Sequence, residues 1–518
     1  MAADQALSRG TKLALFAMGL GVIVIANDFT ALNVALPAME QDFDADVGTI
    51  QWTVNAYVLV FGMGLVTGGR LADMLGRRKI FFIGTAFFAA FSIVGALAPS
   101  ALVLIGARVG MGVGGALMWP AVLGMTFAAL PPARAGLAGG LILGVAGIGN
   151  ALGPLIGGVL TDEFSWRAIF WINVPIAAFA VLAIAKYVHQ PPVEATERRI
   201  DYAGIATVSG GLVAILLGLD QAVDWGWTDP RVLAMFALGA GLLATFAVIE
   251  RRVGEAALIP PDVIANRPFR AACLTVLMLS AVFFSIVLYV PQLLEKVLDF
   301  SALKAGAGML PMLALFAVVA FLAGRLYERV GGRPVIIAGT AFLAAGPLVV
   351  SFFGPDSGYG AIVPGLVLTG IGAGLFYPSI TTAAVTMLVA ARSSLAGGIT
   401  YMFQIAGGAM GLGLATALFT SRSEDRVVSD AGEVGLQMTD DQAGVIHGAL
   451  AGTEPGNAAL SQFDPSVADK VIDVIKDSFV SGVQFSFRVI AAIALVGLVI
   501  AIRGVRVPKT QPQSPEPA

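Results

Sequence analysis

The sequence predicts an all-α polytopic membrane protein with fourteen membrane spans. Hydrophobic residues make up 57% of the 518 residues, charged residues make up only 13%, and the mean hydropathy is +0.85. A water-soluble chain of this length needs more charged and polar groups to cover its surface. Each membrane-spanning helix needs ~20 apolar residues, so fourteen spans would use about 280 of the roughly 295 hydrophobic residues.

Apolar runs of spanning length follow one another from near the N-terminus to residue 503. The first run follows MAADQALSRGTK and continues to about Leu36 without a small-residue cleavage site, so it is expected to remain as a span. The predicted spans cover residues 13–36, 48–69, 80–98, 101–123, 137–160, 168–188, 202–220, 231–250, 270–290, 305–326, 334–353, 359–385, 395–419 and 480–503.

The distribution of charge predicts the orientation of these spans. If the N-terminus is cytoplasmic, most of the 31 Lys and Arg residues fall on the cytoplasmic side, whereas the first outer loop, MEQDFDAD, contains acids and no base. The positive-inside rule therefore favours both termini in the cytoplasm. Residues 421–479 then form an acidic extracytoplasmic loop, whose simplest role is a solvated cap, and the proline-rich tail is predicted to be disordered.

A short motif occurs twice, once after the second span and once after the tenth. The copies are Gly69-Arg-Leu-Ala-Asp-Met-Leu-Gly-Arg-Arg-Lys79 and Gly324-Arg-Leu-Tyr-Glu-Arg-Val-Gly-Gly-Arg-Pro334. Their equivalent placement indicates a duplicated helical bundle. The first glycine permits close helix approach, and the acid that follows can pair with an arginine or face a helix N-terminus.

The first copy resembles the loop between spans two and three of the major facilitator superfamily, whose pattern is G-x-L-A-D-x-x-G-R-[KR]-[KR]. In the second copy, Glu328 replaces the aspartate and Gly332 stands at the first arginine position, so weaker charge pairing is expected there. The duplicated six-span unit and an additional pair of spans look like the fourteen-span drug:proton antiporters. The resemblance thus implies a major facilitator fold of two six-helix bundles plus two additional central transmembrane helices.

This resemblance divides the chain into four parts. The first two parts are an N-terminal six-helix bundle, residues 1–188, and a two-helix central insertion with flanking loops, residues 189–268. The last two are a C-terminal six-helix bundle that includes the extracytoplasmic loop 421–479, residues 269–504, and a disordered cytoplasmic tail, residues 505–518.

Four further motifs match the same family in order along the chain. Residues 28–37 are similar to D-x-T-x-x-N-V-A-L-P of the fourteen-span group, and residues 108–112 to R-x-x-Q-G, with Met111 where glutamine is usual. Residues 149–158 are close to the exporter pattern G-x-x-x-G-P-x-x-G-G. Residues 165–175 look like the W-R-x-x-F-x-I-N-x-P entry to span six.

Asp28 and Arg108 are the candidates for proton coupling. A carboxylate at membrane depth is costly and usually faces a cavity or relay, and its desolvation favours proton uptake. The alternative is a cap or interfacial acid near the outer surface, because Pro37 follows closely. Arg108 needs a carboxylate or several acceptors, such as Asp28 or backbone carbonyls, and structural packing is its alternative role. The family resemblance implies a part in proton transfer, and Met111 removes one amide from the usual network.

Two further sets of residues are candidates for function. For the repeated motif, the resemblance implies a latch that holds the outward-facing state through ion pairs; the alternative is a basic loop that sets the topology of the spans. This gating set is Gly69, Asp73, Gly76, Arg77, Arg78, Gly324 and Glu328. For the glycine-proline motif of span five, the resemblance implies a hinge or a proton-leak seal; the alternative is a packing kink alone. Its residues are Gly149, Gly153, Pro154, Gly157 and Gly158.

Polar and aromatic side chains within the spans are candidates for a substrate cavity, although packing or interfacial roles are the alternative for each. Aromatic rings suit loosely specified apolar or cationic substrates. The candidates are Asn33, Asn55, Tyr57, Trp119, Asn150, Tyr289, Gln292, Tyr377, Tyr401 and Gln404.

Several functions are excluded by the sequence. The G-x-G-x-x-G match at residues 110–115 lies inside an apolar span, which argues against dinucleotide binding. No glycine directly precedes a lysine, so the chain has no G-K-[ST] phosphate loop for ATP-driven transport. The enzyme motifs H-E-x-x-H and G-x-S-x-G do not occur. One cysteine and two distant histidines predict no metal site, and the absence of basic blocks excludes nucleic-acid binding as the main activity. We therefore expect neither an enzyme nor a bound cofactor.

The predicted function is secondary active efflux: proton-coupled antiport of amphipathic drugs or other small molecules out of the cytoplasm. The resemblance implies a bacterial inner-membrane protein of the multidrug-efflux, antibiotic-resistance type. Its expected partners are the lipid bilayer, a small-molecule substrate and protons, with the monomer as the functional unit. A selective exporter or flippase of one endogenous metabolite or lipid is an alternative, and a non-transporting scaffold or sensor is a more remote one.

Overall fold

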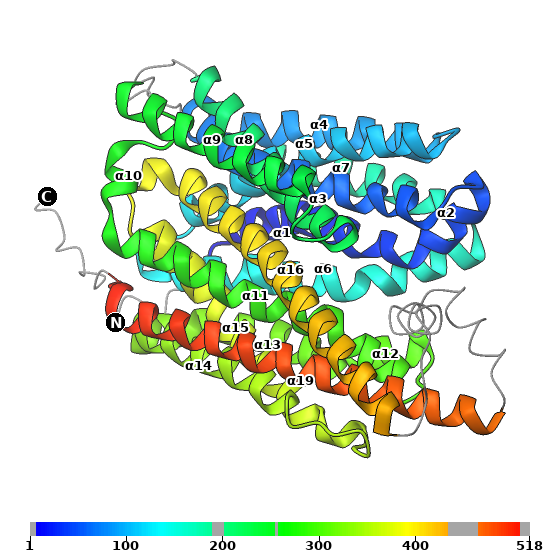
Figure 1. Ribbon diagram of the computed structural model, residues 1–518. Helices are drawn as coiled ribbons and strands as arrows, with labels where there is room; N and C mark the ends of the chain where they lie inside the picture. Colours follow the sequence, from blue (N-terminus) through cyan, green and yellow to red (C-terminus); the bar gives the residue numbers. More distant parts are fainter. Residues whose placement is uncertain (1–6, 189–200, 254–256, 434–464, 508–518) are drawn as a thin grey trace, which may run out of the picture.

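The computed structural model describes residues 7–188, 201–253, 257–433 and 465–507, and every regular element within them is a helix. Fourteen helices are long and apolar enough to cross a membrane, which confirms the predicted fold class and number of spans. Helices suit this environment because each satisfies its backbone hydrogen bonds internally. In Figure 1 the helices lie side by side, and α1 (Arg9–Ala31) begins at the end of the bundle where α19 (Pro465–Gly504) finishes. We call this the termini end and the opposite one the far end.

The N-terminal half consists of long helices, and the described residues that join them form short connections. After α1, a 3-10 turn, η2 (Leu32–Ala35), and a short helix, α2, complete the first crossing at the far end. A second 3-10 turn, η3 (Pro132–Arg134), leads into α6 at the termini end. The helices that follow α1 are α2 Leu36–Phe43, α3 Val47–Leu75, α4 Arg77–Ala96, α5 Ala101–Ala128, α6 Ala135–Glu163, α7 Arg167–Tyr187, α8 Tyr202–Trp225 and α9 Pro230–Val253.

The C-terminal half repeats this pattern. Its spans are α11, α13, α14, α15, α16 and α19, and two short helices, α10 and α12, precede α11 and α13. The 3-10 turns η5 (Tyr359–Ala361) and η6 (Ala390–Arg392) lead into α15 and α16. The bounds are α10 Pro261–Ala265, α11 Arg267–Lys296, α12 Ala302–Gly308, α13 Leu310–Val330, α14 Gly332–Val350, α15 Val363–Thr386 and α16 Ser393–Glu433.

Helix ends follow from local side-chain chemistry. Asp46 and Asn266 each accept a hydrogen bond from the backbone N–H three residues later, and so cap α3 and α11. At the other end of α3, Gly76 has φ = 103°, and Gly331 after α13 has φ = 88°. These two glycines hold equivalent positions in the repeated motif. Each allows a sharp turn between helices that an L-residue with a side chain would adopt only with strain.

The two halves meet along two interfaces. In one, α16 packs against α3 and α5, and in the other, α6 packs against α13 and α15. The inserted helices α8 and α9 pack against each other, and α8 also contacts α3 and α16. The inserted pair therefore lies beside one of the two interfaces, as the neighbouring labels of α8, α3 and α16 in Figure 1 illustrate.

The segment at residues 421–479, predicted as a loop, is helical at both of its ends. α16 continues to Glu433 and α19 begins at Pro465, so much of this segment is helical, and residues 434–464 lie outside the described residues. The helices continue because their apolar side chains pack on each other beyond the predicted spans. Val427 is buried, and the rings of Phe419 and Phe479 are 4.9 Å apart.

Two smaller boundaries also differ from prediction. The tenth span was expected at residues 305–326, but α12 ends at Gly308 and the span begins only at Leu310. Pro311, the second residue of α13, lacks an N–H and its ring disfavours a continuous helix through this point. In the predicted tail, Val505 is buried and donates its N–H to the carbonyl of Ala501; residues 508–518 lie outside the described residues.

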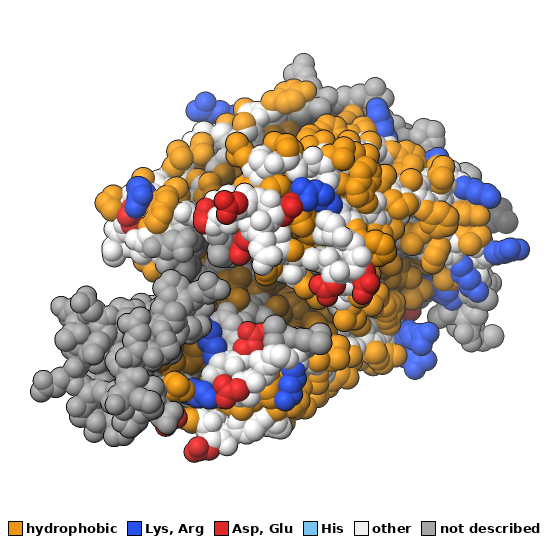
Figure 2. All heavy atoms as spheres, turned by 90° about the vertical axis from the view of Figure 1, so that its right-hand side faces the viewer, with side chains coloured by type: hydrophobic (Ala, Val, Ile, Leu, Met, Phe, Trp, Pro, Cys, Tyr) orange, Lys and Arg blue, Asp and Glu red, His pale blue; other side chains and the backbone are white. Residues whose placement is uncertain are grey.

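The far end carries exposed acidic side chains and is hollowed. Figure 2 views the far end and shows acidic side chains and a surface that is hollowed between the two halves. The exposed acids at this end include Asp42, Asp44 and Asp46. Hydrogen bonding from Thr49 lowers the pKa of Asp46, so this carboxylate stays charged at neutral pH.

Candidate functional site

A buried ion pair joins α1 and α5. Asp28 and Arg108 have exposed fractions of 0% and 1%, and Arg108 Nη1 lies 2.6 Å from Asp28 Oδ2. Arg108 Nε also donates to the carbonyl oxygen of Thr53 at 2.8 Å. Arg108 therefore has both kinds of partner that the sequence analysis considered, a carboxylate and a backbone carbonyl. Asp28 is thus a buried and paired carboxylate.

The second oxygen of Asp28 is held by an asparagine from α7. Asn173 Nδ2 donates to Asp28 Oδ1 at 3.0 Å, and it also lies 3.4 Å from Ser92 Oγ on α4. Met111 stands where an amide was expected, and its sulfur lies 3.8 Å from Arg108 Nη1 as a weak acceptor. Asp28 thus has one charged donor and one neutral donor, in a site where all these side chains are buried.

Aromatic rings connect this pair to the interface between the halves. Arg108 Cζ lies 4.2 Å from the centroid of the Tyr57 ring, a cation–π contact. Tyr57 stacks on Phe61 at 5.8 Å, and Tyr401 of α16 contacts Phe61 at 5.8 Å and Trp119 at 4.4 Å. These four rings, which we call the aromatic cluster, include side chains of both halves. The Tyr57 hydroxyl and the Trp119 indole N–H have no hydrogen-bond partner within the described structure.

Two of the other predicted cavity residues have side-chain partners outside the aromatic cluster. In the C-terminal half, Tyr377 OH lies 3.3 Å from Ser280 Oγ, and Tyr289 OH lies 2.9 Å from Thr416 Oγ1. Asn33 is exposed in η2. The half-buried members of the predicted set are Asn55, Asn150, Gln292 and Gln404.

The first copy of the repeated motif closes the termini end against α16. Asp73 accepts hydrogen bonds from the backbone N–H groups of Ser394 (3.3 Å) and Leu395 (2.8 Å), so its negative charge lies at the N-terminus of α16. Arg77 pairs with Asp73 at 3.0 Å and donates to the carbonyl of Ala390 at 2.8 Å. The motif therefore binds the opposite half through a helix N-terminus and a backbone carbonyl, whereas the Arg77–Asp73 ion pair lies within the motif itself.

The second copy makes the equivalent contact in the opposite direction. Glu328 Oε1 accepts the N–H of Leu137 at 2.9 Å, near the N-terminus of α6. Gly324 packs directly on Gly136, where an added Cβ would lie 2.5 Å from the Gly136 carbonyl oxygen. Each half thus uses one motif carboxylate to cap a helix of the other half.

Arg78, the remaining basic member of the gating set, binds within its own half. It donates to the carbonyls of Ala185 (2.9 Å) and Val188 (3.1 Å) at the end of α7. These contacts fix the start of α4 to the last span of the N-terminal half. Arg78 is therefore placed to hold the motif loop rather than to bridge the halves.

The segment after the inserted helices is also attached to this closed end. Glu250 of α9 is buried and accepts the N–H groups of Leu258 (2.9 Å) and Ile259 (3.1 Å). Asp262 of α10 then pairs with Arg392 in η6, two residues from the carbonyl that accepts from Arg77. This hydrogen bond lowers the pKa of Asp262, which keeps the carboxylate charged at neutral pH.

The glycines of α6 allow it to contact α1 closely. An added Cβ at Gly153 would lie 1.9 Å from Thr30 Oγ1, and one at Gly157 would lie 2.2 Å from the Ala31 carbonyl oxygen. Gly149 is similarly close to Ala26, whereas a Cβ at Gly158 would be 3.7 Å from Val34. Pro154 lies inside α6, and Thr30 Oγ1 donates to the carbonyl of Asn150, which the proline leaves without its helical N–H partner.

We expect Gly157→Ala to destabilise the protein and Gly158→Ala to leave it as stable or slightly more stable. The first methyl group would overlap the α1 backbone, and overpacking of this kind costs about 1–3 kcal/mol. The second would make an ordinary contact, while alanine is favoured over glycine in a helix by roughly 1 kcal/mol. The thermal unfolding midpoint of each purified variant measures the difference. Equal midpoints for the two variants would contradict close packing at Gly157.

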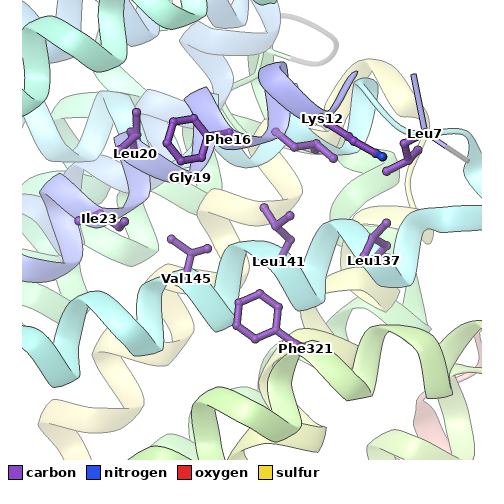
Figure 3. A pocket seen from close by; sticks show the side chains of 11 residues that line it. Leu7, Lys12, Phe16, Gly19, Leu20, Ile23, Leu137, Leu141, Val145 and Phe321 are labelled. Atoms are coloured by element: carbon purple, nitrogen blue, oxygen red, sulfur yellow. The ribbon is translucent and has the colours of Figure 1, made fainter. Parts of the chain in front are cut away.

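Two cavities lie near the closed end, away from the Asp28–Arg108 pair. One, of about 840 Å³, lies at the termini end and is bordered by Arg77, Glu328 and Arg333. The other, of about 420 Å³, is a groove between α1, α6 and α13, shown in Figure 3. Within the described residues, no group of three or more His, Cys, Asp or Glu side chains is arranged to hold a metal ion.

Sequence reasoning missed two partners of the ion pair, Asn173 and Thr53. Asn173 was visible as a polar residue in an otherwise apolar run, two residues before Pro175, but a run of this kind does not reveal which helix it faces. Thr53 contributes a backbone carbonyl, which no side-chain pattern identifies. The backbone N–H groups of Ser394, Leu395 and Leu137, which the motif carboxylates cap, were missed for the same reason.

Comparison with known proteins gives matches over most of the chain. A sequence model of the Major Facilitator Superfamily matches residues 18–412. The tetracenomycin C resistance and export protein of Streptomyces glaucescens is 31% identical over 496 residues, which cover 94% of this chain and 90% of that protein. The puromycin resistance protein pur8 of Streptomyces alboniger is 32% identical over 442 residues, 83% of this chain and 86% of that protein.

A solved structure shows the same fold. The human organic anion transporter MFSD10 aligns with a TM-score of 0.64 over 95% of this chain and 99% of its own, at 13% sequence identity. Identity at this level supports a shared architecture of helices only.

Proposed function

This chain belongs to the Major Facilitator Superfamily, and we propose that it exports antibiotics or other amphipathic small molecules from the cytoplasm in exchange for protons. Its relatives named above are resistance and export proteins. The observation that carries the coupling is the buried pair of Asp28 and Arg108. Burying these two charges in an apolar bundle costs free energy, and ionisable residues kept within membrane spans usually serve a function.

The geometry suggests how a proton would change the site. Protonation of Asp28 would cancel its charge and weaken its bond to Arg108, while Asn173 could still donate to Asp28 Oδ1. Arg108 would then keep its contacts with the Thr53 carbonyl and the Tyr57 ring. Because Tyr57 belongs to both the charged site and the aromatic cluster, a change at Asp28 reaches that cluster through one side chain.

The aromatic cluster is the proposed substrate site. Large rings offer apolar surface and cation–π contacts to substrates of varied shape, and the buried Tyr57 hydroxyl and Trp119 N–H offer polar contacts. The cluster includes Tyr401 from the C-terminal half, so substrate binding there depends on the relative position of the halves. This supplies a physical link between binding and rocking of the halves.

The repeated motifs act as the gate at the termini end. In the present arrangement Asp73 and Glu328 hold the N-termini of α16 and α6, so this end is closed while the far end is hollowed. We assign the termini end to the cytoplasm of a bacterial cell, following the distribution of basic residues. With this assignment, we infer that the transporter is open toward the outside.

The driving force is sufficient for useful export. One elementary charge that moves inward across 100 mV releases about 2.3 kcal/mol, which supports roughly fifty-fold accumulation of a neutral substrate at one-to-one exchange. A pH gradient of the usual sign adds to this.

A susceptibility panel tests the proposed export. The protein would be expressed in a bacterial host that lacks its own major exporters, and inhibitory concentrations measured for structurally different antibiotics and cationic dyes. We expect severalfold protection against at least one compound, together with energy-dependent dye efflux that a protonophore stops. Unchanged susceptibility to the whole panel, despite protein present in the membrane, would argue against drug export.

A further inference from the structure

We propose that the groove between α1, α6 and α13 binds one acyl chain of an anionic phospholipid from the membrane leaflet at the termini end. The groove has a volume of about 420 Å³, and every side chain that lines it is apolar except Lys12. Figure 3 shows Lys12 at one end of the groove, next to Leu7, and Ile23 toward the other.

The length of the groove matches one leaflet. From Lys12 to Ile23, α1 rises about 16 Å, at 1.5 Å per residue. Half of the ~30 Å hydrocarbon core is about 15 Å. A chain whose headgroup lies near Lys12 would therefore end near the middle of the bilayer, as an acyl chain of a phospholipid does.

The charge at the mouth of the groove selects the headgroup. Lys12 is exposed and has no ion-pair partner among the described residues. Arg9 lies three residues earlier, on the same face of α1. Two more arginines, Arg134 of η3 and Arg325 of α13, lie near Glu328, whose negative charge offsets part of theirs. A phosphate fits this environment, whereas a cationic drug would be repelled.

Small and flat side chains make room for the chain. An added Cβ at Gly19 would meet only Val145, at 3.9 Å, so the glycine leaves open space rather than close packing. On the opposite wall, the Phe321 ring lies against Gly144 of α6. The groove therefore has walls from both halves of the protein, α1 and α6 on one side and α13 on the other. A lipid bound there would favour the arrangement in which the termini end is closed.

Lipid binding to the purified full-length protein tests this proposal without a transport assay, so its outcome is independent of the proposed export. Native mass spectrometry would count bound phosphatidylglycerol and phosphatidylcholine on the wild type, Lys12→Gln and Gly19→Leu. Lys186→Gln is the matched control, because Lys186 lies at the termini end of α7, outside the groove.

We expect wild type to prefer phosphatidylglycerol, and Lys12→Gln to lose about fivefold in affinity for it. Gly19→Leu should reduce binding of both lipids by filling the groove, and Lys186→Gln should behave as wild type. Retained preference in Lys12→Gln, or undiminished binding in Gly19→Leu, would overturn the proposal. Displacement of bound phosphatidylglycerol by an exported drug in wild type would assign the groove to substrate and also overturn it.

Discussion

Asp28→Asn should abolish export driven by a pH gradient. Asparagine has nearly the same shape and keeps an oxygen that can accept from Asn173, but it cannot take up or release a proton. Removing one member of a buried ion pair typically costs about 3–5 kcal/mol, so some loss of stability is also expected. The measurement is uptake of a transported dye by everted membrane vesicles under an imposed pH gradient.

Two further variants separate coupling from folding. Asp42→Asn is the matched control: Asp42 also pairs with an arginine, Arg167, at 2.6 Å, but its side chain is 42% exposed. This variant should retain gradient-driven uptake, because an exposed pair contributes little. The double variant Asp28→Asn with Arg108→Gln removes the uncompensated buried charge, and it should regain stability but not gradient-driven uptake. Full gradient-driven uptake by Asp28→Asn would show that another group couples protons to transport.

Gly69→Val should open the termini end and stop transport. A Cβ at Gly69 would lie 2.7 Å from the carbonyl oxygen of Ser394 and 2.9 Å from Leu395 Cα, so α3 and α16 would have to separate. The capping hydrogen bonds of Asp73 to the start of α16 lie four residues away and would be lost with that separation. Gly324→Val should act in the same way on α13 and α6.

Distances between spin labels can measure this opening. Labels at Lys79 and Val389, both exposed and in different halves, report on the termini end, and the one native cysteine, Cys273, is buried. In Gly69→Val the distance should lengthen relative to the wild type. Gly106→Val is the control, because a Cβ there meets nothing within 4 Å. Unchanged distances in Gly69→Val would mean that the interface accommodates the side chain without opening.

Hydropathy predicted the fourteen helices because lipid leaves the backbone few alternatives to a helix. It could not place the ends of α16 and α19, since Val427 and Phe479 become buried only when those two helices pack together beyond the apolar runs. The short helix α12 was missed because the apolar pattern continues through the break that Pro311 introduces.

The candidate site could be predicted only in part, and for a related reason. The cost of a charge in an apolar run singled out Asp28 and Arg108 from the sequence. Their mutual contact, and the third partner, Asn173, depend on which helices are neighbours and how each is rotated. The motif suggested that Asp73 would face a helix N-terminus, but only packing identifies that helix as α16, in the other half of the chain.

If one carboxylate, Asp28, exchanges its proton for substrate, then substrate binding must release protons from the protein. Purified protein in weakly buffered detergent solution would receive a transported compound while a pH-sensitive dye reports protons. We predict proton release from the wild type and from Asp42→Asn, and none from Asp28→Asn at substrate concentrations that saturate its binding. Equal proton release from Asp28→Asn, or saturating substrate binding to the wild type without any release, would mean that Asp28 is not the group that exchanges its proton for substrate.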